Sequence, residues 1–305
     1  MIQPLNNMKK ILTLLSAALV LFACNPTINP GPDPSENPSS EPSDNPSQEP
    51  SAEPANDPGI SKVTLTIYME GRTSEEMEKH HQEISVPNFD ANGRLTGYSR
   101  EVWLQEVEWP ESGSVIMHFV KSVDETVTFT YDDTAKKVST VYKGISYNYN
   151  EDCSDFSEEP FEDDPVVMQF DENWCYVGDP LLAYYYKDSY LSGIGSKNVV
   201  WRDGDMVVCG DCDIQYGTEP NTLASTLDYS LYEALGEEYA FGFLGKRCAH
   251  LPIKIVDHQD GFDIINECSA TKDSEGRITS LKFQRLDSET GEKLGRYSLI
   301  EYEYK

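Results

Sequence analysis

The chain is poor in positive charge and has no long apolar run. Its 305 residues include 24 Lys and Arg against 53 Asp and Glu, which gives a formal net charge of −29 at pH 7. A chain this acidic repels nucleic acid and anionic lipid, so we predict no nucleic-acid partner. The mostly apolar run Ile11–Phe22 is too short to cross a bilayer as a helix.

The sequence also lacks the usual signatures of catalysis. It contains no HExxH pair, no Gly-x-Ser-x-Gly elbow and no phosphate-cradling glycine loop, and it has only five histidines. The acidic stretch 151–164 lacks the spacing of a calcium-binding EF-hand loop, which favours a solvated loop. We therefore predict no catalytic residue, no metal and no cofactor, and a protein that is not an enzyme.

Residues 1–23 have the organisation of a secretory signal peptide. A basic pair, Lys9–Lys10, precedes the apolar run, and Met8 is an alternative start to Met1. The segment ends in LFAC, which resembles the lipobox of bacterial lipoproteins and implies that Cys24 carries the lipid. An ordinary signal peptide with a coincidental cysteine is the alternative. The resemblance favours an envelope location, lipid-anchored at the outer membrane, with the surface or periplasmic face left open.

Residues 24–59 form a predicted tether behind the lipid anchor. After Cys24 this segment holds ten prolines, seven acidic residues and no basic ones. Proline removes backbone donors, and nothing in the segment is apolar enough to build a core. Its 35 residues beyond the cysteine, in polyproline form, reach on the order of 100 Å from the membrane.

Residues 60–305 have the periodicity of strands. Apolar and polar residues alternate in stretches such as 63–68 and 278–283, which predicts strands with one buried face. The related sequences DANGR from Asp90 and DSEGR from Asp273, and less clearly DTAKK from Asp133, have the composition of tight turns. Asp203–Gly204 predicts the tip of another hairpin. The fold class is therefore mainly β, an antiparallel meander of hairpins in a curved or barrel-like sheet, with a sub-boundary near residue 180 as an alternative.

A single helix is predicted to pack on this sheet. Asn221 is the expected cap, and leucines recur every fourth residue from Leu223 to Leu235. Gly236 is expected to end the helix. The leucine stripe favours packing on the sheet, with a partner-binding helix as the alternative.

The C-terminal part resembles a known family. WRDGD, the predicted helix, FLGKRCAHLP (243–252) and DSEGRITSLKF are similar to segments of Bacteroidetes lipoproteins that carry a domain of unknown function with a porin-like fold. The resemblance covers residues 180–305 clearly and the earlier hairpins more loosely. It implies a curved antiparallel sheet or an open barrel-like meander, and it implies no enzyme activity.

Six cysteines follow Cys24, and an even number in an exported chain favours disulfides. The candidates are Cys153, Cys175, Cys209, Cys212, Cys248 and Cys268. The pair Cys209–Cys212 also has the spacing of a thiol oxidoreductase, although its setting predicts a strand junction. A zinc site that adds Cys248 and His250 is a further alternative, but the spacing matches no standard pattern.

Tyrosines supply the candidate binding residues. In LAYYYKDSY, Tyr184 and Tyr186 share one strand face and Tyr190 follows. Tyrosine presents an apolar ring with a polar tip, which suits a glycan or a protein partner, although rings in the core are the alternative. We therefore expect a membrane-anchored, non-catalytic module that binds a glycan or an envelope or host protein. An envelope structural or assembly protein, and a thiol oxidoreductase, are the alternatives.

Overall fold

The computed structural model describes residues 59–70, 77–108, 115–178, 183–223, 227–259 and 261–305. The predicted signal peptide, Cys24 and nearly all of the tether lie outside these ranges. The strands are β1 (Ile60–Glu70), β2 (Met77–Phe89), β3 (Leu95–Glu108), β4 (Ile116–Asp132), β5 (Lys137–Tyr149), β6 (Phe156–Glu162), β7 (Val166–Gln169), β8 (Tyr184–Lys187), β9 (Tyr190–Ile194), β10 (Lys197–Arg202), β11 (Asp205–Cys209), β12 (Cys212–Pro220), β13 (His250–Gln259), β14 (Phe262–Lys272), β15 (Ile278–Leu286) and β16 (Lys293–Tyr304).

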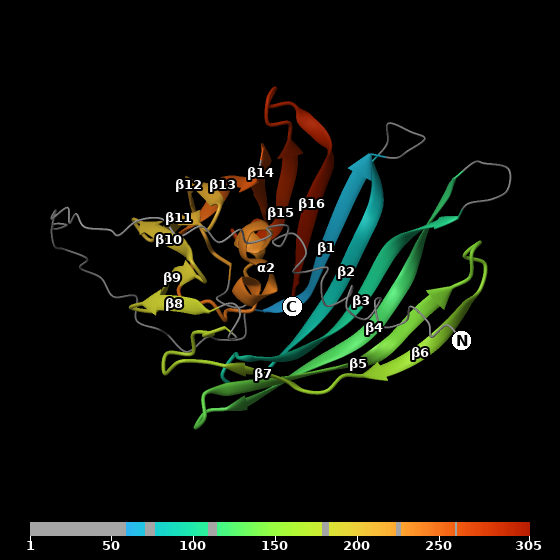
Figure 1. Ribbon diagram of the computed structural model, residues 1–305, viewed down its shortest axis with the longest axis horizontal. Coiled ribbons are helices and arrows are strands. Elements are labelled where there is room, and N and C mark those ends of the chain that lie inside the picture. The colour runs from blue at the N-terminus through green and yellow to red at the C-terminus, as the bar shows by residue number, and fades with distance from the viewer. Residues whose placement is uncertain (1–58, 71–76, 109–114, 179–182, 224–226, 260) are drawn as a thin grey trace, which may run out of the picture. The chain divides into compact units, whose positions relative to one another are not determined.

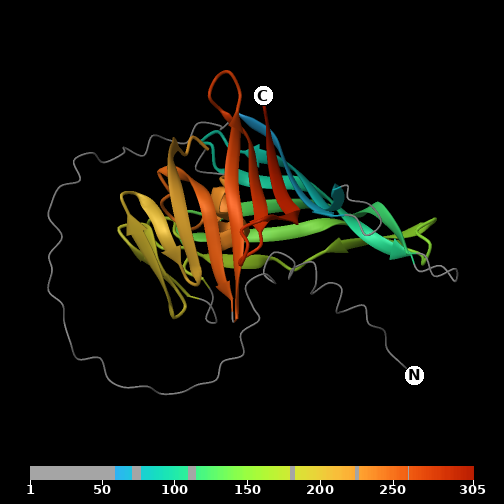
Figure 2. The same cartoon turned by 90° about the horizontal axis from the view of Figure 1, so that it is seen from above.

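The strands build one curved antiparallel sheet, as predicted. Its order is β6-β5-β4-β3-β2-β1-β16-β15-β14-β13-β12-β11-β10-β9-β8, and β7 also pairs with β5. Each half is a meander, and the first and last strands pair in the middle. Figure 1 shows the sheet bending around the helix α2, and Figure 2 shows β1–β6 extending beyond it.

The two edges of the sheet approach each other at one end. The Val177 amide donates to the Gln169 carbonyl at the end of β7, and the Tyr184 amide at the start of β8 donates to the Val177 carbonyl. The sheet is not closed along its length. One segment between the edges therefore links them by two backbone hydrogen bonds.

The repeated turn is confirmed at Asp90 and Asp273. In both turns the aspartate accepts from two backbone amides and from the arginine Nε four residues later, at 2.8–3.0 Å. The third copy is offset by one residue, because Asp132 rather than Asp133 accepts the turn amides. Lys136 takes the positive φ of 54° at that turn, where the other copies have glycine.

The predicted helix exists but starts later than expected. A short 3-10 helix, η1 (Tyr229–Leu231), leads into α2 (Tyr232–Ala240). The cap is Asp228, whose carboxylate accepts from the Ser230 amide, while Asn221 caps only a local turn at Leu223. Gly236 interrupts α2 with a φ of 69° rather than ending it. Residues 224–226, inside the predicted helix, lie outside the described ranges.

Two apolar clusters fill the concave side of the sheet. The larger holds buried leucines of the α2 region, including Leu231 and Leu235, against strands from β1 and from β9 to β16. The smaller is aromatic and packs Phe241 and Phe243, just after α2, against Tyr98 and Phe129. Within the described part of the chain, no helix is long and apolar enough to cross a membrane.

Candidate functional site

A buried charge cluster joins α2 to three strands on the concave face. Arg100 of β3 donates to Glu83 of β2 at 3.1 Å, to Glu125 of β4 at 2.7 Å and to Glu237 of α2 at 2.9 Å. Its side chain is only 13% exposed. We call these four residues the inner cluster. One guanidinium faces three carboxylates there, so the cluster carries excess negative charge.

The pKa values of two of these carboxylates move in opposite directions. Burial raises the pKa of Glu237 to about 7, aided by Glu83 and Glu238 and opposed by Arg100. Burial also acts to raise the pKa of Glu83, but the Arg100 charge and a hydrogen bond from His81 outweigh it and lower that pKa to about 2. Glu237 is therefore the carboxylate that takes up the proton most readily.

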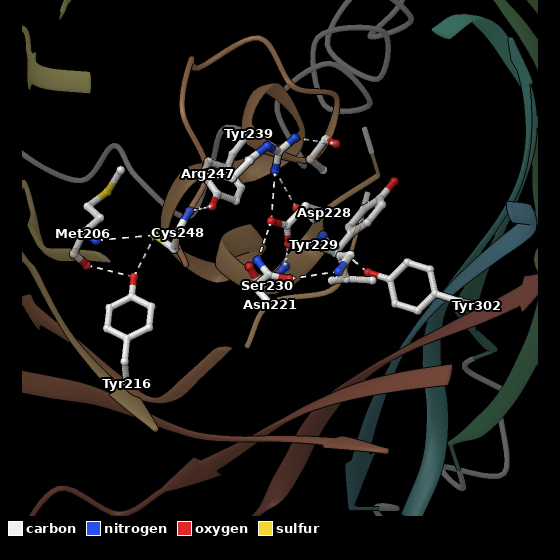
Figure 3. Close-up of polar contacts among 12 residues, drawn as sticks. Met206, Tyr216, Asn221, Asp228, Tyr229, Ser230, Tyr239, Arg247, Cys248 and Tyr302 are labelled. Carbon is white, nitrogen blue, oxygen red and sulfur yellow. Dashed lines mark hydrogen bonds and ion pairs between the residues drawn. The ribbon is translucent and has the colours of Figure 1, made fainter. Parts of the chain in front are cut away.

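A second polar network fixes the chain just before α2. Figure 3 shows Asp228 between Asn221, Arg247 and the Ser230 amide. The Asp228 carboxylate accepts from Asn221 Nδ2 at 2.9 Å and lies 3.3 Å from Arg247 Nη1. Asp228 is fully buried. Because these bonds pair a buried charge and cap η1, the network has a structural role.

The structure does not bear out the predicted disulfides, because all six cysteines are free thiols. Five of the thiols are buried, and Cys153 lies in the turn after β5. Four of the buried thiols lie in the larger apolar cluster, yet none is bonded to another. Cys248, for example, accepts from the Met206 amide and lies 3.1 Å from the Tyr216 hydroxyl (Figure 3).

The Cys-x-x-Cys pair forms the ends of a tight hairpin, as its setting predicts. Cys209 of β11 faces Cys212 of β12 across the turn. Burial raises the pKa of Cys209 to about 12 and raises that of Cys212 as well. Reactive thiols of oxidoreductases need the opposite shift. No group of three His, Cys, Asp or Glu side chains in the described ranges is placed to hold a metal ion, and His250 bonds to Asp205.

The tyrosines that sequence reasoning singled out are engaged within the protein. Tyr184 and Tyr186 pack against the larger apolar cluster, and the Tyr186 hydroxyl donates to the Tyr176 carbonyl. Tyr190 packs against the Trp201 ring. The exposed ring of this run is Tyr185, at 55%. A ligand-binding role for Tyr184, Tyr186 and Tyr190 stays a prediction.

A surface that the sequence did not reveal lies on the opposite side of β3–β5 from α2. Because side chains alternate along a strand, Glu101 and Trp103 point away from the face that holds Arg100. Lys121 of β4 pairs with Glu101 at 3.0 Å and with Asp124 at 3.1 Å, and the Tyr147 hydroxyl of β5 donates to Asp124 at 2.9 Å. These bonds form a continuous polar row across three strands.

A β-bulge makes this row possible. Residues three apart in a regular strand point to opposite faces, which would separate Lys121 from Asp124. The register between β3 and β4 shifts after Val102, so Ser122 is an extra residue in β4. The shift turns Lys121 to the side of Asp124.

Aromatic rings flank the polar row at both ends. On one side Trp103 stacks with Phe119, with ring centroids 6.1 Å apart and planes 17° from parallel. On the other side Phe156 of β6 lies 5.6 Å from Tyr147 and 5.5 Å from Tyr149, and it is 49% exposed. We call this surface the outer face; its members are Glu101, Trp103, Phe119, Lys121, Asp124, Tyr147, Tyr149 and Phe156.

No family model matches the chain, and no curated protein matches it. It is similar to a solved structure described as a porin-like protein from Bacteroides uniformis, at 12% identity and a TM-score of 0.40. The match covers 81% of this chain and 98% of the other. This is a likeness of chain path, and no statement on function follows from it.

Proposed function

We propose that the protein is an envelope lipoprotein, anchored through Cys24, whose folded domain binds a glycan or protein ligand through its outer face. The observation that carries the proposal is a cluster of five aromatic rings, four half-buried and one exposed, around a hydrogen-bonded polar row. Aromatic rings gathered on a surface with polar groups of fixed direction are typical of recognition sites.

The two faces of these strands differ in what covers them. On the concave side, α2 and the aromatic residues that follow it pack onto β3 and β4. Figure 1 shows α2 on the concave side of β3 and β4, and on the outer side the charged groups pair with one another. The outer face is therefore the side of these strands from which a ligand can approach.

The predicted tether fits a protein that works at a distance from its membrane. A segment rich in proline and acidic residues stays extended and keeps the domain away from the lipid surface. The net charge of −29 has the same effect at a membrane that carries anionic lipid. An outer-membrane anchor with the domain held away from the lipid is the arrangement that we propose.

The anchor is tested with Cys24→Ser in the full chain. We expect radiolabelled palmitate to label the wild type and not the variant, and the variant to keep its signal peptide and to run as the larger, unprocessed chain. Protease treatment of intact cells then tells whether the domain lies on the surface or on the periplasmic side. Absence of label from the wild type, or labelling of the variant, contradicts lipid anchoring through Cys24.

The outer face is tested with a photoreactive phenylalanine analogue placed at Tyr147 in intact cells. The matched control places it at Tyr185, an exposed ring on β8. We expect cross-linked species from position 147 that are missing from position 185. Equal yields from the two positions, or none from either, contradict a binding role for the outer face.

A further inference from the structure

We propose that the ligand of the outer face is an uncharged glycan chain, held between its two aromatic groups and hydrogen-bonded to the polar row between them. This inference rests on the proposed function, since it names the ligand class of the same surface.

The rings offer apolar surface to sugar rings, and Phe156 is the most exposed of them at 49%. A pyranose presents flat patches of C–H groups, which pack against aromatic faces, and its hydroxyls point around the rim. The Trp103–Phe119 pair lies on β3 and β4, and the Phe156 group lies on β5 and β6. Trp103 and Tyr147 are two strands apart, or roughly 10 Å. That separation suits a short run of linked sugars better than one ring.

The polar row offers the groups that sugar hydroxyls need. Glu101 and Asp124 are acceptors, Lys121 is a donor, and the Tyr147 hydroxyl can do both. Glu101 also accepts from the Trp103 indole N–H at 3.3 Å, so the row fixes one of the platforms. The carboxylates are 44% and 37% exposed, which leaves oxygen lone pairs open to solvent and to ligand hydroxyls. Because the side chains already hold one another, little ordering is required on binding.

Charge selects against anionic ligands and against a typical protein partner. The one cation of the polar row, Lys121, is held by two carboxylates, and the chain as a whole is strongly acidic. Sulfated or uronic-acid polymers would therefore be repelled. The buried centres of protein–protein interfaces are depleted of charged residues, whereas the centre of this surface is a charged row. An uncharged, hydroxyl-rich polymer fits both observations.

The test is affinity electrophoresis of the full chain in native gels that contain a single polysaccharide. The panel contains neutral glucans, mannans, xylans and galactans, with polygalacturonate and a sulfated glycan as the anionic set. We expect at least one neutral polymer to retard the wild type and neither anionic polymer to do so. Failure of every neutral polymer, or retardation only by anionic ones, overturns the proposal.

Matched variants locate the site. Trp103→Ala and Phe156→Ala should each weaken binding to the retarding polymer by about tenfold, because each removes one stacking platform. Trp103→Phe should restore part of the loss, and Tyr185→Ala should leave binding unchanged. Thermal unfolding of every variant shows whether the fold is kept. Retardation that folded Trp103→Ala and Phe156→Ala retain in full places the glycan elsewhere and overturns the inference.

The two proposals fail in different ways. If position 147 cross-links a protein and no neutral polymer retards the chain, the outer face is a binding surface and the glycan assignment is wrong. If position 147 cross-links nothing and no polymer binds, both proposals are wrong. Glycan binding that depends on Trp103, together with cross-linked carbohydrate at position 147, supports both.

Discussion

The two faces of β3 and β4 place similar charges in very different surroundings. Arg100 and Glu101 are neighbours in sequence, as are Asp124 and Glu125, yet one member of each pair points toward α2 and the other toward solvent. On both faces a single cation contacts more than one carboxylate. The inner cation, Arg100, is 13% exposed, and its partner Glu125 is 6% exposed.

Burial, rather than the number of ion pairs, decides how strongly the charges of each face affect the free energy of unfolding. In the inner cluster the charges have lost most of their water, so each uncompensated carboxylate is costly and the pKa values of Glu83 and Glu237 move apart. On the outer face, water screens the same kinds of contact, and they contribute little to folding. The inner cluster therefore bears on stability, and the outer face is free to serve binding.

Removing the inner cation should have the largest effect on stability. Arg100→Met leaves Glu125 and Glu237 without a cation and Glu83 with His81 alone, and we expect a loss of roughly 3–5 kcal/mol of unfolding free energy at neutral pH. The measurement is urea unfolding followed by tryptophan fluorescence. Arg94→Met is the control, because Arg94 also contacts two carboxylates but is 39% exposed and should cost less than about 1 kcal/mol. Equal losses in the two variants would show that burial does not decide how much each arginine contributes to stability.

The inner cluster should also give stability a defined dependence on pH. The pKa of Glu237 is raised on folding to about 7, so the folded state holds this proton more tightly and stability falls as pH rises from about 4.5 to 7. The pKa of Glu83 is lowered, so its contribution is present above about 4.5 and is lost as pH falls toward 2. From these two groups we expect maximal stability in mildly acid solution.

Glu237→Gln tests the fall in stability with rising pH that we assign to Glu237. The variant cannot ionise, so it should be more stable than the wild type at pH 8 by on the order of 2 kcal/mol and should lose the decline above about pH 4.5. The loss of stability toward acid pH that we assign to Glu83 should remain. In the Arg100→Met background the gain should be larger, because no cation then offsets the third carboxylate. A variant that is less stable than the wild type at pH 8 would show that the Arg100–Glu237 ion pair outweighs the repulsion.

Local signals in the sequence were sufficient for the sheet and its turns. Asp90 and Asp273 carry the information for their turns within five residues, and strict alternation marks the strands. The helix was misplaced because Asn221 and Asp228 are both plausible caps in sequence, and only tertiary contacts with Arg247 and Tyr302 distinguish the true start.

The candidate site could not be predicted from the sequence, because its residues are far apart along the chain. Its rings come from four strands between Trp103 and Phe156, and only sheet pairing brings them together. The bulge at Ser122 has no sequence signal, yet it decides which face Lys121 occupies. In LAYYYKDSY the tyrosines are adjacent in sequence, which favours this run as a binding site, but two of its rings pack against the core.

The outer cation gives the smallest expected effect and the sharpest contrast with Arg100. Lys121→Met removes two ion pairs and the contact of the Lys121 ammonium with the Trp103 ring, all at a partly exposed site, so we expect a loss of about 1 kcal/mol or less. The loss should shrink further in high salt, because exposed pairs are screened. Unfolding in urea at low and high salt measures both quantities. Since Lys121 is the sole cation of the polar row, the variant should still weaken glycan retention in the gel assay. A loss that approaches that of Arg100→Met would mean that the polar row stabilises the fold as much as the inner cluster does, which contradicts the proposed difference between the two faces.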